Sequence, residues 1–178
     1  LELAEISGGA SFNKANLNYA VLIKANLKDA NFIETTLVNA NFHEANLAGA
    51  HFRGADLTSA NLTEADLQGA DFTEAHLYEA NLSQASIIKT KLEQAYLDRC
   101  RVYGCSVWDI RGEPASQKDL LISDKNDGDI TTDDVEVAQF IYLMYDNKKI
   151  RNIINSVTSK GVLILGRFSP PERKVVLD

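Results

Sequence analysis

Residues 45–74 read ANLAGAHFRGADLTSANLTEADLQGADFTE, and the same five-residue pattern runs from Ala10 to Asp109. Every fifth position from Ala10 onward is small, and alanine occupies 16 of these 20 positions. Two residues after each small position stands a large apolar residue, which is leucine or phenylalanine in 17 of 20 cases. None of these 40 positions is charged, so each block of five supplies one small and one large residue to an interior.

A period of five fits neither regular secondary structure. On an α-helix, five steps of about 100° move successive apolar residues around the axis, so no apolar stripe forms. On one continuous strand, the odd period sends every second block to the opposite face. Within a block, however, the small, polar and large side chains alternate inward, outward and inward. We therefore predict short extended segments that are separated by corners and wound into a coil.

The phenylalanines indicate the length of one coil. Four of the five central phenylalanines, Phe12, Phe32, Phe52 and Phe72, follow one another at intervals of 20 residues, and Phe42 is the exception. A coil of four blocks stacks these four rings in one core column. The adjacent core column then consists of Leu17, Leu37, Leu57, Leu77 and Leu97.

Blocks such as 55–59 (ADLTS) and 60–64 (ANLTE) resemble the pentapeptide-repeat family, whose consensus is A(D/N)LXX. The resemblance covers residues 10–109 and implies an all-β fold. In that fold, a right-handed quadrilateral β-helix forms a solenoid of about five coils, each made of four pentapeptides. Thr35 and Thr90 occupy small positions, where their hydroxyls need main-chain partners.

The repeat stops after Ile110, and the composition changes. We expect a small α-helical C-terminal extension, because Thr131 with Asp134 three residues later forms a helix-start signal. The predicted organisation is an N-terminal cap at 1–9, the β-helix at 10–109, a linker at 110–130, a helical pair at 131–160, and a strand and helix start at 161–178.

The last of these segments resembles the lead-in to a Toll/interleukin-receptor-like α/β domain. Residues 162–166 (VLILG) form an apolar run of the buried-strand type, and 169–172 (SPPE) form a helix-capping box. Because the chain starts with Leu1 and stops at Asp178 inside this expected helix, we expect it to be a fragment of a longer polypeptide.

Composition excludes several classes of function. The 178 residues are 45% apolar and 24% charged, which is typical of a globular protein. No run approaches the roughly 20 apolar residues of a membrane-spanning helix, so we expect a cytoplasmic protein without membrane contact. The net charge of −7 argues against direct binding of nucleic acid, because phosphates require clustered lysine and arginine.

Residues that carry chemistry are sparse and separated. If residues 20 positions apart stack on the same side of the coil (the 20-residue rule), His43, His51 and His76 lie on three different sides. We therefore predict no metal site. Cys100 and Cys105 occupy positions that otherwise hold alanine, which predicts packing rather than reactivity. No nucleophile is accompanied by a base, so we predict neither enzymatic activity nor a cofactor.

These observations favour a non-catalytic interaction or scaffold module, the regulatory part of a larger bacterial signalling protein. One side of the solenoid collects outward aromatic and apolar residues, which we predict to bind a protein partner or a second copy unless the C-terminal helices cover them. This interaction surface consists of Val38, His76, Tyr78 and Tyr96.

Two alternative functions remain open. One is a DNA mimic that inhibits or protects gyrase, as the resemblance to gyrase-protecting family members suggests, since residues 1–110 carry 14 acidic and 8 basic residues. The other is an effector enzyme in a missing C-terminal α/β domain.

Overall fold

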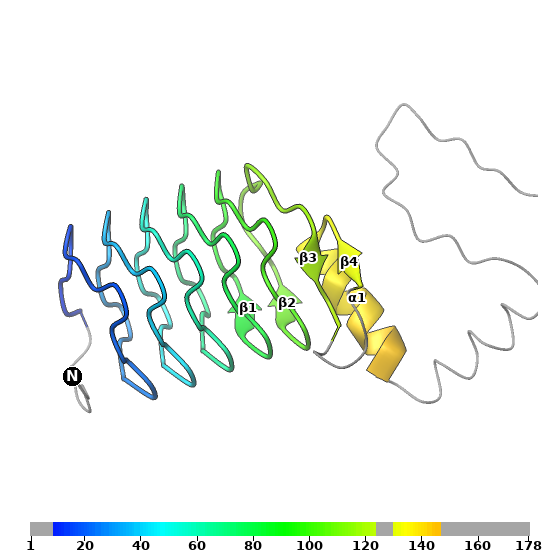
Figure 1. The fold of residues 1–178 in the computed structure, drawn as a ribbon, viewed down its shortest axis with the longest axis horizontal. Coiled ribbons are helices and arrows are strands. Elements are labelled where there is room, and N and C mark those ends of the chain that lie inside the picture. The colour runs from blue at the N-terminus through cyan, green and yellow to red at the C-terminus, as the bar shows by residue number, and fades with distance from the viewer. Residues whose placement is uncertain (1–8, 124–129, 147–178) are drawn as a thin grey trace, which may run out of the picture. The chain divides into compact units, whose positions relative to one another are not determined.

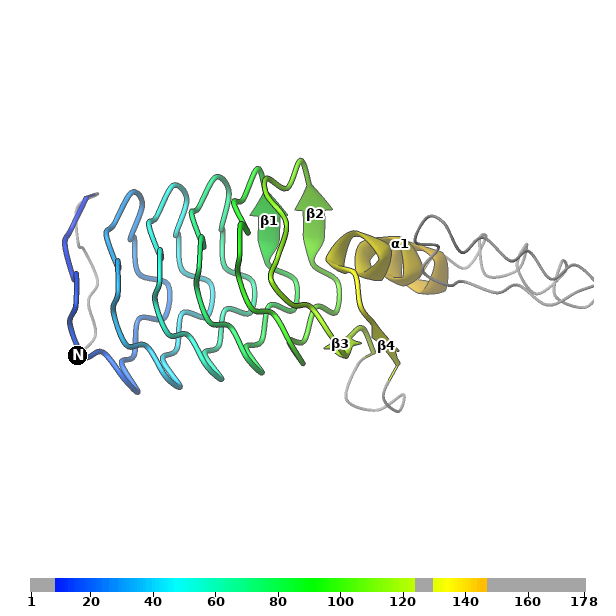
Figure 2. The same cartoon turned by 90° about the horizontal axis from the view of Figure 1, so that it is seen from above.

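The computed structural model describes residues 9–123 and 130–146 and shows a coiled β-helix followed by one helix (Figure 1). Parallel bridges join residues 20 positions apart, as between Ser11 and Asn31. Four such bridges start in the first coil, at Ser11, Asn16, Val21 and Asn26. The predicted repeat β-helix is therefore confirmed, and successive coils lie side by side along one axis (Figures 1 and 2).

Each block turns its corner through one residue in the left-handed conformation. Glu64 and Ser59 have φ values of 59° and 56°, and glycine fills the same place at Gly69, where φ is 70°. The amide of the following small residue closes the turn, as Ala65 N–H donates to the Leu62 carbonyl over 3.1 Å. The left-handed residue provides the corner that a five-residue period requires.

Asn and Asp precede the central residue because their side chains satisfy a main-chain donor beside the corner. Asp56 Oδ1 accepts the Thr58 N–H over 3.0 Å, and Asn61 Oδ1 accepts the Thr63 N–H over 3.1 Å. These amides donate to a side chain instead of to the neighbouring coil, as in an Asx turn. The consensus residue therefore has a structural role in the wall of the coil.

The core contains the expected column of stacked rings. Phe12, Phe32, Phe52 and Phe72 stack with centroid distances of 5.0, 4.9 and 4.7 Å. Phe42 meets Phe32 and Phe52 edge to face, at 5.9 and 6.2 Å. Both geometries are favourable for aromatic pairs.

The leucine column packs against these rings. Its buried members are Leu37, Leu57, Leu77 and Leu97. Leu17, like Phe12, belongs to the first described coil and is partly buried. The threonine hydroxyls find carbonyl partners 23 residues earlier: Thr35 donates to Phe12 O over 2.7 Å and Thr90 to Leu67 O over 2.9 Å.

The ladder extends beyond the last clear sequence repeat. Two short parallel strands, β1 (Ser86–Ile88) and β2 (Ser106–Trp108), pair along one side. Further bridges then join Tyr96 to Ser116 and Arg101 to Leu121. The linker expected at 110–130 therefore begins with another turn of the coil, which keeps its main-chain pairing although its side-chain pattern has changed.

A short antiparallel pair and a helix follow this last turn. The strand β3 (Leu120–Leu121) pairs with β4 (Thr131–Thr132), so Thr131 does not start the helix as expected. The helix α1 (Val135–Asp146) begins instead after Asp134, whose Oδ1 accepts the N–H groups of Glu136 and Val137 over 2.9 and 3.0 Å. Asp134 is therefore the N-cap.

The helix α1 covers the C-terminal end of the coil (Figure 2). Val135 and Ala138 are buried in the same core cluster as the last coils. Val107 N–H donates to Gln139 Oε1 over 3.1 Å, and Val135 N–H donates to Gln117 Oε1 over 3.2 Å. The helix thus protects core that the end of a β-helix would expose.

Several expected segments lie outside the described residues. They are residues 1–8 of the cap expected at 1–9, the second helix expected within 147–160, and the strand and helix start at 161–178. Within 9–123 and 130–146, no helix is long and apolar enough to cross a membrane.

Candidate functional site

Three residues of the predicted interaction surface form one cluster on the wall of the coil. The His76 ring lies on the Tyr96 ring with centroids 4.8 Å apart and planes inclined by 6°. This stacking follows from the parallel bridge that pairs His76 with Tyr96 in the next coil. Tyr78 follows His76 by two residues, across the buried Leu77, and therefore points outward on the same side. We call His76, Tyr78 and Tyr96 the tyrosine patch.

An arginine completes the edge of the tyrosine patch. Arg99 Nη1 donates to the Tyr78 hydroxyl over 3.2 Å, and its guanidinium carbon lies 6.0 Å from the centre of that ring. Arg99 also pairs with Glu79 over 3.3 Å. The hydrogen bond to Tyr78 raises the pKa of Arg99. Tyr78 and Tyr96 each keep 41% of their surface exposed, while one polar tip is held in position.

Val38 does not join this cluster. It stands in the same column as Tyr78 but two coils earlier, with Thr58 between them. Its side chain is half-buried, and its N–H donates to Asn18 Oδ1 over 2.9 Å. The 40 residues between Val38 and Tyr78 correspond to these two coils of 20 residues each.

The other candidate residues lie apart from one another. His43 interacts with Glu44 and His51 lies on another side, so neither approaches His76. Among the described residues, no group of three histidine, cysteine or acidic side chains is arranged to hold a metal ion. Burial raises the pKa of both Cys100 and Cys105, the latter to about 12, so both thiols stay protonated.

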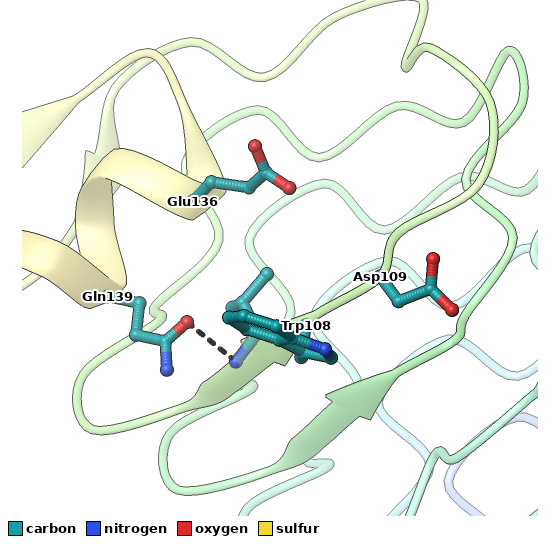
Figure 3. A pocket seen from close by; sticks show the side chains of 5 residues that line it. Trp108, Asp109, Glu136 and Gln139 are labelled. Carbon is teal, nitrogen blue, oxygen red and sulfur yellow. Dashed lines mark hydrogen bonds between the residues drawn. The ribbon is translucent and has the colours of Figure 1, made fainter.

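A second surface feature, beside α1, was not among the sites predicted from the sequence. A hollow of about 460 Å³ is lined by Val107, Trp108, Asp109, Glu136 and Gln139. Figure 3 shows the Trp108 ring lying between α1, which supplies Glu136 and Gln139, and Asp109. Trp108, the only tryptophan of the chain, is 73% exposed. A large aromatic side chain is more often mostly buried. The sequence does indicate that Trp108 points outward, because it directly follows the inward-pointing central residue Val107.

Another hollow, of about 370 Å³, is polar. Its lining includes Asn81, Ser83, Arg101 and Tyr103, and Arg101 Nη1 donates to the Ser123 carbonyl over 2.9 Å. The Ser83 hydroxyl donates to Asn81 Oδ1 over 2.7 Å. These contacts already engage Arg101 and Ser83 in the wall of the coil.

The solved structures to which this chain is similar include two pentapeptide repeat proteins from cyanobacteria and a resistance protein. HetL, involved in heterocyst differentiation regulation in the cyanobacterium Nostoc sp. strain PCC 7120, is 24% identical, with 60% of this chain and 62% of HetL covered and a TM-score of 0.39. Rfr23 from the cyanobacterium Cyanothece 51142 is 25% identical, with 67% and 84% covered and a TM-score of 0.47.

QnrB1, a plasmid-mediated fluoroquinolone resistance protein, is 28% identical, with 58% of this chain and 56% of QnrB1 covered and a TM-score of 0.38. The chain thus spans less than two thirds of the length of HetL and of QnrB1. No curated protein matches the sequence.

The family model described as pentapeptide repeats matches eight copies over residues 8–43, 37–73 and 65–104. These matches cover more than half of the 178 residues and coincide with the coil whose pairing repeats every 20 positions. The chain therefore belongs to the pentapeptide repeat family.

Proposed function

We propose that this chain is a non-catalytic protein-interaction module, the regulatory or scaffold part of a larger bacterial signalling protein. Its platform is a right-handed quadrilateral β-helix with four pentapeptides per coil, and its binding surface is the tyrosine patch. The observation that carries this proposal is the exposed stack of His76 on Tyr96 beside the Tyr78–Arg99 pair. Aromatic side chains with one fixed polar tip are common anchors of protein interfaces.

The position of α1 supports an external partner for the tyrosine patch. The helix contacts the coil at Tyr103, Val107 and Gln117, where Tyr142 meets Tyr103 edge to face at 5.1 Å. Tyr78 and Tyr96 meanwhile keep 41% of their surface exposed. The described helix therefore leaves the patch open to a partner protein or a second copy.

The DNA-mimic alternative has less support, because cations interrupt the acidic columns. Glu44 and Glu64 stand in one column, but Lys24 precedes them and pairs with Glu44 over 3.2 Å. On another side, Lys91 pairs with Asp71 over 3.0 Å. A DNA mimic requires a continuous negative track to compete for a basic groove.

The test replaces Tyr78 and Tyr96 together by serine in the full 178-residue chain. We expect the double variant to lose self-association in sedimentation, or to lose a partner that the unmodified chain retains from a cell extract and rebinds when purified. Tyr19→Ser is the matched control, because Tyr19 is 72% exposed and lies outside the tyrosine patch. The proposal is rejected if the double variant keeps every association of the unmodified chain.

A further inference from the structure

The outer face of α1 is a second surface that none of the coil residues described here covers, and it is distinct from the tyrosine patch. Its inner face packs on the coil through Val135 and Ala138. At 100° per residue, Phe140 and Leu143 fall on the opposite face, on the same side as Glu136. Phe140 and Leu143 are 55% and 52% exposed. The helix therefore has two apolar faces, of which the coil covers only one.

The Trp108 hollow lies beside this outer face. Glu136 and Gln139 line the hollow. Glu136 belongs to the exposed side of α1 that also carries Phe140, four residues later, whereas Gln139 is half-buried on the flank that faces the coil. The amide of Gln139 is fixed to the main chain of Val107, so one wall of the hollow is held in place (Figure 3). An apolar strip on α1 thus adjoins a hollow that has an exposed indole ring.

Both charged residues that line the hollow are acidic. Asp109 and Glu136 line it, and neither forms an ion pair with any of the residues described here. Glu136 also lines an adjoining hollow of about 100 Å³, together with Glu113 and Asp134. An indole ring between carboxylates favours a lysine or arginine side chain, which gains a cation–π contact and an ion pair together.

We propose that the Trp108 hollow and the outer face of α1 dock a basic amphipathic helix of a partner protein. A lysine or arginine of that helix lies on Trp108 between Asp109 and Glu136, and its apolar side packs on Phe140 and Leu143. This inference rests on the proposed interaction function but assigns it a second surface and a partner chemistry.

The same charges disfavour the other occupants. A second copy docked face to face would bring the same carboxylates against each other, which is unfavourable when no cation lies between them. An anionic membrane surface or a nucleic acid would be repelled for the same reason. A basic helix is the occupant whose charge and apolar stripe both match.

The experiment uses the full 178-residue chain and a synthetic 15-residue peptide made of leucine and lysine, with leucine at i, i+3, i+4 and i+7. Trp108 is the only tryptophan, so its emission reports directly from the proposed site. We expect a saturable blue shift of that emission, because the peptide covers the indole ring. The same peptide with glutamate in place of lysine should bind at least tenfold more weakly.

Two charge-neutralising pairs make the test specific. Asp109→Asn with Glu136→Gln should weaken binding of the lysine peptide at least tenfold, and asparagine tolerates the left-handed backbone of residue 109, where φ is 54°. Asp29→Asn with Glu64→Gln changes the net charge equally and should leave the affinity within twofold. Asp29 stands in the column of Asp109 but four coils earlier, and Glu64 lies on another side of the coil. Phe140→Ala should also weaken binding while the lysine-over-glutamate preference remains.

Several outcomes would overturn the proposal. Equal loss in both charge pairs would mean that the attraction is only the net charge, and equal binding of both peptides would mean an apolar surface without charge selection. An emission maximum that shifts with protein concentration alone would assign the face to a second copy. If acrylamide quenches Trp108 poorly in the free chain and no peptide binds, another part of the same chain covers the indole ring. The tyrosine patch is tested by different variants, at Tyr78 and Tyr96. A negative result for the Trp108 hollow therefore leaves the proposed function untouched, and the reverse also holds.

Discussion

The imidazole of His76 lies flat on the phenol ring of Tyr96, with ring centroids 4.8 Å apart, although 20 residues separate them in the chain. The same spacing stacks Phe52 on Phe72 inside the coil at 4.7 Å. One backbone rule therefore builds two kinds of column, a buried one that stabilises the fold and an exposed one that is available for binding.

Replacing neighbouring residues of the two columns should separate these roles. Leu97→Ala removes a buried side chain, and we expect a loss of about 2–5 kcal/mol in the free energy of unfolding. Tyr96→Ala removes a side chain that is 41% exposed, and we expect a loss of at most about 1 kcal/mol. Urea unfolding followed by circular dichroism measures both. A loss in Tyr96→Ala as large as that in Leu97→Ala would mean that Tyr96 is mainly structural.

Phe52 occupies the middle of the aromatic column and should be sensitive to truncation. Phe52→Ala removes the contacts with Phe32, Phe42 and Phe72, and we expect a loss of about 3–5 kcal/mol. Phe52→Leu should cost less than about 1.5 kcal/mol, because Leu92 holds the equivalent position two coils later. The measurement is denaturant unfolding of both variants.

Phe12→Ala is the matched control for the aromatic column. Phe12 stacks only on Phe32 among the described rings and is partly buried, so its truncation should cost less than that of Phe52. Equal costs at residues 12 and 52 would contradict the view that the column is stabilised from both sides.

The coil could be predicted from the sequence because the same five-residue repeat determines the corners, the core residues and the pairing between coils. Alanine is the small residue that the closely packed wall of the coil accepts. The 20 residues between Phe12 and Phe32 equal the sequence separation of the residues that pair between neighbouring coils. The stacking of His76 on Tyr96 followed from the same arithmetic. These features depend only on residues that repeat in register.

The ends of the coil were less predictable, because no neighbouring coil covers them. Gly112 and Gln117 stand where earlier coils have leucine or phenylalanine, and Gln117 instead accepts the N–H of Val135 from α1. The last turn therefore lost its sequence pattern while keeping its ladder. The hollow beside Trp108 depends on where α1 packs, which no local pattern encodes.

Thr35 tests how a polar side chain is accommodated in the core. Its hydroxyl donates to the Phe12 carbonyl over 2.7 Å, a separation too short for a methyl group. Thr35→Val should therefore cost about 1–3 kcal/mol, since the methyl must move away and the hydrogen bond is lost. Thr35→Ala should cost less, because alanine is the usual residue at this position. Urea unfolding ranks the two variants, and a valine variant as stable as the alanine variant would contradict the assigned role of the hydroxyl.

Interrupted acidic columns predict that the chain does not inhibit DNA gyrase. In a supercoiling assay we expect no inhibition by the unmodified chain, because Lys24 neutralises Glu44 at the head of one acidic column. Lys24→Glu extends this column and provides the comparison. Potent inhibition by the unmodified chain, relieved by Glu44→Lys with Glu64→Lys, would restore the DNA-mimic function.

Cys100 and Cys105 predict a specific loss of stability in alkali. Burial raises the pKa of Cys105 in the folded chain to about 12 and raises that of Cys100 as well. In the unfolded chain an exposed thiol ionises near pH ~8.5, so the unfolded state releases its protons at a lower pH than the folded state. The contribution of these thiols to stability is therefore complete below about pH 8.5 and is lost as the pH rises toward 12, by about 1.4 kcal/mol per pH unit for each thiol.

The double variant Cys100→Ala with Cys105→Ala isolates this effect, because alanine fills the equivalent positions Ala80 and Ala85 one coil earlier. Lysine and tyrosine also titrate in alkali, so the quantity to measure is the difference in the free energy of unfolding between the two chains from pH 7 to pH 11. Near pH 7 we expect a small difference, since the main loss is the bond from the Cys100 thiol to the Leu77 carbonyl at 2.9 Å. Above pH ~9 the unmodified chain should lose stability relative to the double variant. A difference that stays constant over the whole range would mean that the thiols ionise equally in both states and are not enclosed by the core.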